Sequence, residues 1–149
     1  KYGVNEEGSG DMYYKGGNLV HFVRQLFNDD EKFRSALREM NKRFYHKITT
    51  SAEVEKFWSE KVGRDLSTLF DQYLRETKVP TLEINRQGNH FKYRWSDCLS
   101  NFNAPVRVEL NNEMVCIYPT TVWKEYKSKK KVESLTIDKN FYVGFSELY

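Results

Sequence analysis

Residues 11–17, with the sequence Asp-Met-Tyr-Tyr-Lys-Gly-Gly, contain the side chain whose chemistry first stands out. Tyr13 lies just before a glycine pair and next to a run with the apolar periodicity of a helix. The start of that helix can therefore hold the Tyr13 side chain in a defined orientation. A phenol is neutral at pH 7 and donates a hydrogen bond to a developing negative charge. Composition alone does not single it out, because the chain has ten tyrosines and most tyrosines are packed aromatics.

Residues that commonly bind metals are few and widely spaced. The three histidines are His21, His46 and His90, and no two of them are four residues apart, the spacing that places two imidazoles on one helix face. We expect His21 to be a hydrogen-bonded helix histidine. Cys98 and Cys116 cannot form a zinc cluster or a disulfide framework. We expect both to be free and buried, with one bridge between them as the alternative.

The first half of the chain has the periodicity of amphipathic helices. We predict a first helix from about Met12 or Lys15 to Phe27, and a second after Asn28 or Asp29, either of which can cap it. The basic side chains on the other face of the second helix should form a solvated surface. The expected apolar faces of these two helices are Leu19, Val20, Val23, Leu26, Phe27, Phe33, Ala36, Leu37, Met40 and Phe44.

Two shorter helices should follow. Residues 50–53 have the form of a capping box, and Gly63 is suited to end the helix that this box begins. Asp65 can cap the fourth helix, and residues 79–80, Val-Pro, end the helical half. The expected buried face of the fourth helix is Leu66, Leu69, Phe70, Tyr73 and Leu74.

After residue 80 the apolar residues alternate, as in strands. Strands are expected at 82–84, 91–95, 106–110, 114–118, 132–137 and 141–145. We predict hairpin turns at residues 87–89, 111–112 and 138–140, and an exposed loop at 127–131. Short strands at this spacing are typical of an antiparallel sandwich. The predicted fold is therefore α+β in two segregated parts: a helical subdomain over residues 1–80, then a small antiparallel β-sandwich over residues 81–149 that packs on the helices.

Four motifs in order resemble the back half of the catalytic domain of the M1 zinc aminopeptidases, the gluzincin family related to aminopeptidase N. They are Tyr-x-Lys-Gly at 13–16, the Thr-Thr helix start at 49–53, Gly-x-Asp-Leu at 63–66 with its following helix, and Val-Pro at 79–80. The resemblance covers about residues 12–86. Gly17 replaces a frequent alanine, and Tyr73 stands where tryptophan is frequent.

The resemblance implies a role for one residue. In the family, zinc polarises the scissile carbonyl and activates a water, and the motif tyrosine donates to the tetrahedral oxyanion. By motif position Tyr13 is that catalytic residue, or Tyr14 if the register differs by one, while Lys15 packs or pairs near the helix start. A small β-sandwich directly after the helical subdomain is also common in the family.

The resemblance also implies that part of the enzyme lies elsewhere. The family's zinc ligands, a His-Glu-x-x-His helix and a later glutamate, precede the tyrosine motif, and this chain lacks them. We therefore expect a fragment of a longer zinc aminopeptidase that binds no zinc and hydrolyses no peptide alone. Its expected partners are the peptide substrate in the parent enzyme and the missing N-terminal zinc subdomain. The apolar face left without that subdomain should favour self-association.

Charge and hydropathy argue against nucleic-acid binding and against a membrane-spanning segment. The chain has 24 basic and 21 acidic residues and a net charge of +3, a mixed surface and not a nucleic-acid footprint. No run approaches the 18 apolar residues of a membrane span. A non-catalytic protein- or peptide-interaction module stays open as the alternative function. The sequence leaves open the compartment, with an exported or cell-envelope parent as one suggestion, and the substrate residue preference.

Overall fold

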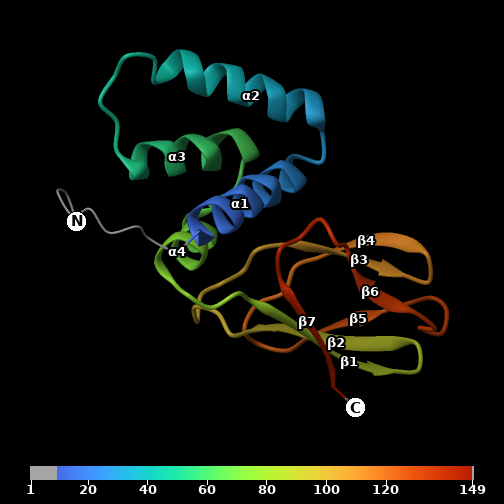
Figure 1. Ribbon diagram of the computed structural model, residues 1–149. Coiled ribbons are helices and arrows are strands. Elements are labelled where there is room, and N and C mark those ends of the chain that lie inside the picture. Colours follow the sequence, from blue (N-terminus) through green and yellow to red (C-terminus); the bar gives the residue numbers. More distant parts are fainter. Residues whose placement is uncertain (1–9, 149) are drawn as a thin grey trace.

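The structure, a computed structural model, describes residues 10–148, and for Asp11 and Met12 the backbone alone. Within this range four helices precede seven strands, which confirms the α+β class (Figure 1). The helices are α1 Asp11–Phe27, α2 Asp30–Arg43, α3 Ser51–Val62 and α4 Ser67–Arg75. The strands are β1 Thr81–Gln87, β2 His90–Ser96, β3 Val106–Leu110, β4 Glu113–Ile117, β5 Lys124–Lys127, β6 Leu135–Ile137 and β7 Gly144–Leu148.

The ends of α2 and α3 follow the predicted local signals, and α1 begins at Asp11, one residue from the predicted Met12. Asp29 caps α2 by accepting hydrogen bonds from the backbone N–H groups of Glu31 and Lys32, at 3.0 and 3.1 Å. The Thr50–Glu53 capping box opens α3, and Gly63 ends it in the left-handed conformation, with φ of 73°. The basic side chains of α2 are exposed, as predicted.

Two details of the helices differ from the prediction. The N-cap of α4 is Leu66 and not the predicted Asp65, although the Asp65 carboxylate accepts the backbone N–H of Ser67 at 2.9 Å. Val20 and Leu74, expected in the core, are 51% and 52% exposed, because the side of α1 and α4 on which they lie has no covering element among residues 10–148. Gln72 is buried instead, although nothing in its periodicity marked it.

The strands of residues 81–148 form two sheets, with orders β5-β2-β1-β7 and β4-β3-β6. The hairpins β1–β2 and β3–β4 have the predicted turns, and both Asn111 and Asn112 adopt positive φ, as a tight hairpin turn requires. Alternate residues of β1 to β3 point into the space between the sheets, as in the burial pattern of β3, where positions 106, 108 and 110 are buried.

The predicted hairpin between the last two strands is wrong. β6 pairs antiparallel with β3, whereas β7 joins the other sheet and pairs parallel with β1. The segment between β6 and β7 carries the chain from one sheet to the other. It turns at Asp138 and buries Phe141 in the core. Strand β5 was not predicted, and its last residue, Lys127, was placed in the expected loop. Its sequence, Lys-Glu-Tyr-Lys, has one apolar anchor, Tyr126, which stacks on Phe91 at 5.1 Å.

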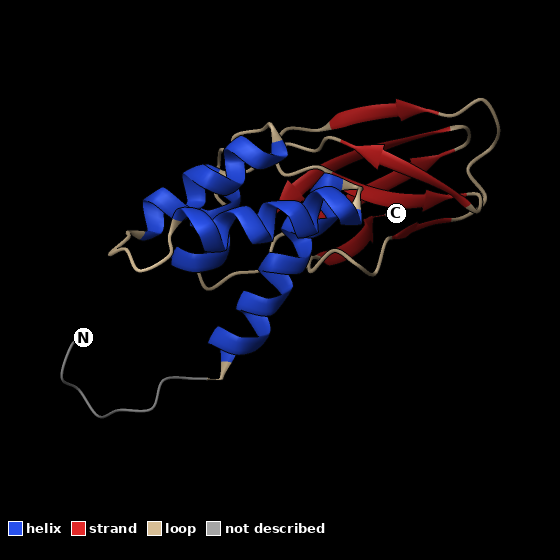
Figure 2. Ribbon diagram, turned by 90° about the horizontal axis from the view of Figure 1, so that it is seen from above, coloured by secondary structure: helices blue, strands red, loops and turns tan. Residues whose placement is uncertain are grey.

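Helices and sheets share one hydrophobic core, so the predicted packing of the sandwich on the helices is confirmed. Phe22 of α1 meets Phe141 edge-on at 4.9 Å between ring centroids. The Tyr73 hydroxyl of α4 donates to the backbone carbonyl of Tyr142. Figure 2 shows the helices gathered at one end of the molecule and the strands at the other. None of the described helices is long and apolar enough to cross a membrane.

Candidate functional site

The two tyrosines of the Tyr-x-Lys-Gly motif lie on the first turn of α1 and face solvent. Tyr13 is 75% exposed and Tyr14 is 77% exposed. The backbone N–H of Tyr13 donates to the carbonyl of Gly10 at 3.1 Å, which closes that turn. A phenol in this place is held by a helix at its backbone and is free at its hydroxyl end.

Lys15 connects this turn to the end of α4. Its Nζ donates to the backbone carbonyl of Glu76, the residue at the C-terminal end of α4. A cation at a helix C-terminus satisfies a carbonyl that lacks a helical partner and interacts favourably with the helix dipole. The prediction that Lys15 pairs near the helix start is therefore confirmed.

A cavity of about 440 Å³ opens beside the motif. Tyr14 and Lys15 line it from α1, Tyr73 and Leu74 from α4, and Tyr142 from the segment before β7. Burial, and to a lesser degree the neighbouring Tyr142, raises the pKa of Tyr73, so its hydroxyl stays a neutral donor. Sequence analysis did not point to Tyr142, because this residue is 69 positions from Tyr73 and lies in the segment that crosses between the two sheets.

An apolar groove of about 290 Å³ adjoins this cavity, and Leu74 lines both. Its walls come from α1, α3 and α4. Its apolar lining residues are Leu19, Val20, Val23, Val54, Trp58, Phe70 and Leu74. Apolar surface of this kind is typical of a place where another element or chain packs.

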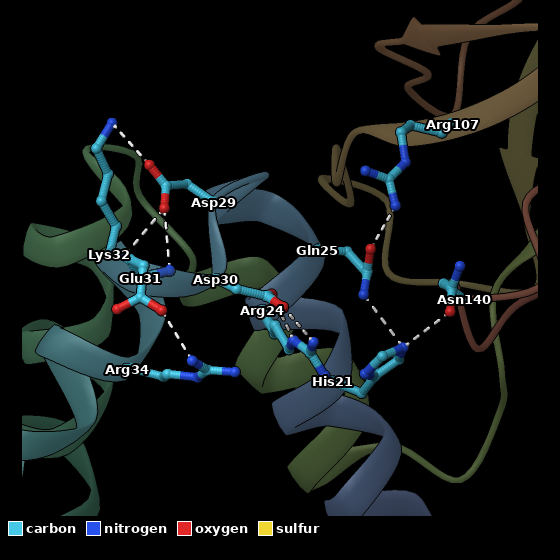
Figure 3. Close-up of polar contacts among 10 residues, drawn as sticks. All are labelled: His21, Arg24, Gln25, Asp29, Asp30, Glu31, Lys32, Arg34, Arg107 and Asn140. Atoms are coloured by element: carbon cyan, nitrogen blue, oxygen red, sulfur yellow. Dashed lines mark hydrogen bonds and ion pairs between the residues drawn. The ribbon is translucent and has the colours of Figure 1, made fainter.

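His21 lies on a different part of α1, facing the sandwich. Its Nε2 is 3.2 Å from Nε2 of Gln25 and 3.2 Å from Oδ1 of Asn140 (Figure 3). Arg107 of β3 donates to Gln25 in the same cluster. These contacts tie α1 to the sandwich and confirm His21 as a hydrogen-bonded helix histidine.

The cysteines are both free, as expected, but only one is sheltered. Cys98 is half-buried, and burial, with a smaller contribution from Asp97, raises its pKa to about 11. Cys116 is exposed, so the expectation that both are buried was wrong. It lies on an outward-facing position of β4, opposite Arg107 of β3, where the alternation of the strand turns it away from the core.

Metal ligands do not come together in residues 10–148. No group of three or more His, Cys, Asp or Glu side chains in this range is placed to hold a metal ion. The described residues therefore do not fit a zinc site by themselves, and no zinc chemistry can be assigned to them.

No family model and no curated protein sequence matches the chain. Among solved structures, the chain is similar to aminopeptidase A of Legionella pneumophila, solved in complex with aspartic acid, with a TM-score of 0.72 and 14% sequence identity. The match covers 95% of this chain and 18% of that one. The two proteins thus share a fold over nearly the whole chain, and the chain spans about a fifth of the length of the aminopeptidase.

Proposed function

We propose that the chain is the C-terminal part of the catalytic domain, with the following β-sandwich, of an M1-type zinc aminopeptidase. The observation that carries the proposal is the fold likeness over 95% of the chain to a segment of an aminopeptidase. The ordered motifs at 13–16, 49–53, 63–66 and 79–80 support it independently. On this proposal the zinc ligands belong to another part of the parent enzyme, and the chain alone removes no N-terminal residues from peptides.

Tyr13 has the proposed catalytic role of donating to the oxyanion of the tetrahedral intermediate. A neutral phenol binds a ground-state carbonyl weakly and an oxyanion strongly, so it stabilises the transition state selectively. Its 75% exposure on the first turn of α1 leaves the hydroxyl accessible to a substrate held by the rest of the enzyme. Tyr14 is equally exposed but also lines the cavity with Lys15, which favours a packing role for it.

The test uses the full-length parent enzyme with an aminoacyl anilide as substrate. Tyr13→Phe should lower kcat about a hundredfold or more while the zinc content stays the same. Tyr14→Phe is the matched control, since it removes a hydroxyl of the same exposure from the adjacent position. Unchanged turnover in Tyr13→Phe, with a large loss in Tyr14→Phe, would move the role by one residue. Unchanged turnover in both would remove the catalytic proposal.

The apolar groove between α1, α3 and α4 is the proposed contact surface for the missing zinc subdomain. Val20 and Leu74 are half-exposed there and would be buried by it. Without that subdomain, the chain should self-associate through the same groove. Sedimentation velocity of wild type and of Val20→Asp tests this: the wild type should form dimers or larger species with rising concentration, and the variant should stay monomeric. A monomeric wild type at all concentrations would contradict it.

A non-catalytic interaction module is the second candidate, and the same exposed groove favours it. It requires that the parent chain lack the His-Glu-x-x-His helix, so sequencing upstream of Lys1 decides between the two. A parent without zinc and without peptidase activity would leave the interaction module as the function.

A further inference from the structure

The loop between α2 and α3 carries apolar side chains that point into solvent. Residues 44–48, which we call the α2–α3 tip, lie at the end of the helical part far from both sheets (Figures 1 and 2). Ile48 is fully exposed, and Tyr45 is 72% exposed. A single exposed apolar residue is ordinary, but two large ones three residues apart in one loop need an explanation.

The fold holds this tip in place. The backbone N–H of Lys47 donates to the carbonyl of Phe44 at 3.2 Å, and His46 adopts a positive φ of 50° to make the turn. Phe44 packs edge-on against the buried Phe57 at 6.0 Å, which anchors the start of the tip. The Thr50–Glu53 capping box anchors its end. Ile48 is thus presented outward by ordered structure on both sides.

Basic side chains surround the tip. A cavity of about 290 Å³ adjoins Phe44 and Ile48 of the tip, and its charged lining residues are Arg43, Lys47, Glu53 and Lys56. Arg43 pairs with Glu60 at 3.1 Å, and the Glu53 carboxylate accepts the backbone N–H of Thr50 at 2.7 Å.

Neither Lys47 nor Lys56 makes an ion pair within residues 10–148, so both are available to a ligand there. Lys42 adds a further exposed cation in the last turn of α2. The four cations outnumber the two acids, Glu53 and Glu60, and both acids are engaged within the helices.

We infer that the α2–α3 tip is a docking surface for an anionic lipid bilayer, with Tyr45 and Ile48 entering the interface and Lys47 and Lys56 facing headgroup phosphates. Apolar side chains flanked by lysines are the combination that binds anionic interfaces, and tyrosine is favoured at headgroup depth. Ile48 lines the same cavity as Lys47 and Lys56, so an apolar side chain and two cations lie together, as an anionic interface requires. This inference does not depend on the aminopeptidase proposal.

The test is co-sedimentation of the 149-residue chain with vesicles at about 0.15 M salt. Vesicles of phosphatidylcholine with phosphatidylserine should bind the chain, and pure phosphatidylcholine should bind it far more weakly. Lys47→Gln combined with Lys56→Gln should lower binding about 25-fold, roughly fivefold for each lysine. The matched control, Lys129→Gln with Lys130→Gln, removes the same charge from the exposed lysine-rich loop and should have little effect. Equal losses in the two pairs would mean non-specific attraction and would overturn the inference.

The apolar contribution has its own pair of variants. Ile48→Ser should weaken vesicle binding about tenfold, since it removes one buried aliphatic side chain. Val122→Ser, at a position 71% exposed on the sandwich, should not. All these side chains are exposed, and circular dichroism confirms that each variant is folded.

A tryptophan at the tip separates a bilayer from an acidic protein. The Ile48→Trp variant adds one tryptophan at the tip. Vesicles with acyl chains brominated near the headgroup should quench a larger part of the tryptophan fluorescence of this variant than of the wild type. If poly-glutamate instead binds with the same dependence on Lys47 and Lys56, and no added quenching occurs, the partner is an acidic polypeptide and the lipid inference is wrong.

Discussion

Asp138 shows how one buried carboxylate ties the crossing segment to the rest of the molecule. It accepts hydrogen bonds from the backbone N–H of Asn140 at 3.0 Å and from Nε of Arg107 at 2.9 Å. Burial alone would raise its pKa, but these hydrogen bonds, together with one from the Asn140 side chain, outweigh burial and hold the pKa below its usual value. The charged form is therefore favoured in the folded state.

A pH dependence of stability follows from this lowered pKa. A carboxyl with a depressed folded-state pKa stabilises the protein above its unfolded pKa of about 4, and this stabilisation is lost as the pH falls through the folded value. Between about pH 5 and pH 3 the free energy of unfolding of the wild type should fall more steeply than that of Asp138→Asn. Urea denaturation at several pH values measures the free energy of unfolding of both proteins. The contributions of the other carboxyl groups cancel when the two values are subtracted. Parallel curves would contradict the prediction.

Gln72 is the buried polar residue that the apolar pattern of α4 did not reveal. Its Nε2 donates to the carbonyl of Lys78 at 2.9 Å, and its Oε1 accepts the backbone N–H of Leu99 at 2.7 Å. Gln72→Leu keeps the volume but leaves the Leu99 N–H without this acceptor. We expect a loss of about 2 kcal/mol in the free energy of unfolding. Asp71→Asn, at the neighbouring half-buried position, weakens only a surface ion pair with Arg75 and should cost less than about 0.5 kcal/mol in the same urea titration.

At the scale of elements, Gly144 explains how β7 can lie parallel to β1. It pairs with Thr81, and a Cβ at position 144 would lie 2.7 Å from Oγ1 and 3.3 Å from Cβ of that threonine. Gly144→Ala should destabilise the protein by about 1–3 kcal/mol, because the clash forces the strands apart. Thr81→Ala removes Oγ1 and Cγ2, the atoms that the new Cβ would meet. The loss of unfolding free energy in the Gly144→Ala, Thr81→Ala double variant should therefore be smaller than the sum of the two single losses, by at least half of the Gly144→Ala loss. Additive losses in thermal unfolding would mean that the contact is not the cause.

Elements with strong local signals were predictable. The capping box at Thr50 and the turn at Asn111–Asn112 depend on hydrogen bonds and φ values set within a few residues, so their sequence suffices. The last two strands depend instead on partners distant in sequence. The pairing of β6 with β3 and of β7 with β1, with Phe141 buried between these strands, joins residues far apart in the sequence, which no local pattern encodes.

The candidate site divides in the same way. The sequence pointed to the stretch 13–16 through its motif, and the structure places Tyr13 and Tyr14 on one exposed helical turn. Leu74 was found from the periodicity of α4, but Tyr142 was not, because the fold brings it to the cavity from a distant segment. The catalytic role of Tyr13 stays a prediction.

At the scale of the whole molecule, the helices and the sandwich share a core across the boundary near residue 80. The edge-on pair of Phe22 and Phe141, the Tyr73–Tyr142 hydrogen bond and the contact of Arg64 Nη2 with the carbonyl of Asn103 at 2.8 Å all cross it. A sandwich of this size would have only marginal stability alone. The two predicted parts should therefore behave as one folding unit.

Cooperative unfolding is the consequence that can be measured. Helix content, followed by far-ultraviolet circular dichroism, and sandwich packing, followed by fluorescence of a Trp58→Phe variant in which only Trp95 and Trp123 emit, should have the same urea midpoint. Phe141→Ala should cost about 3–5 kcal/mol and shift both midpoints equally, because Phe141 is 5% exposed and serves both parts. Tyr142→Ala at the neighbouring exposed side chain is the control and should shift both much less. Two separate transitions, or a shift in one signal alone, would show that the parts fold independently.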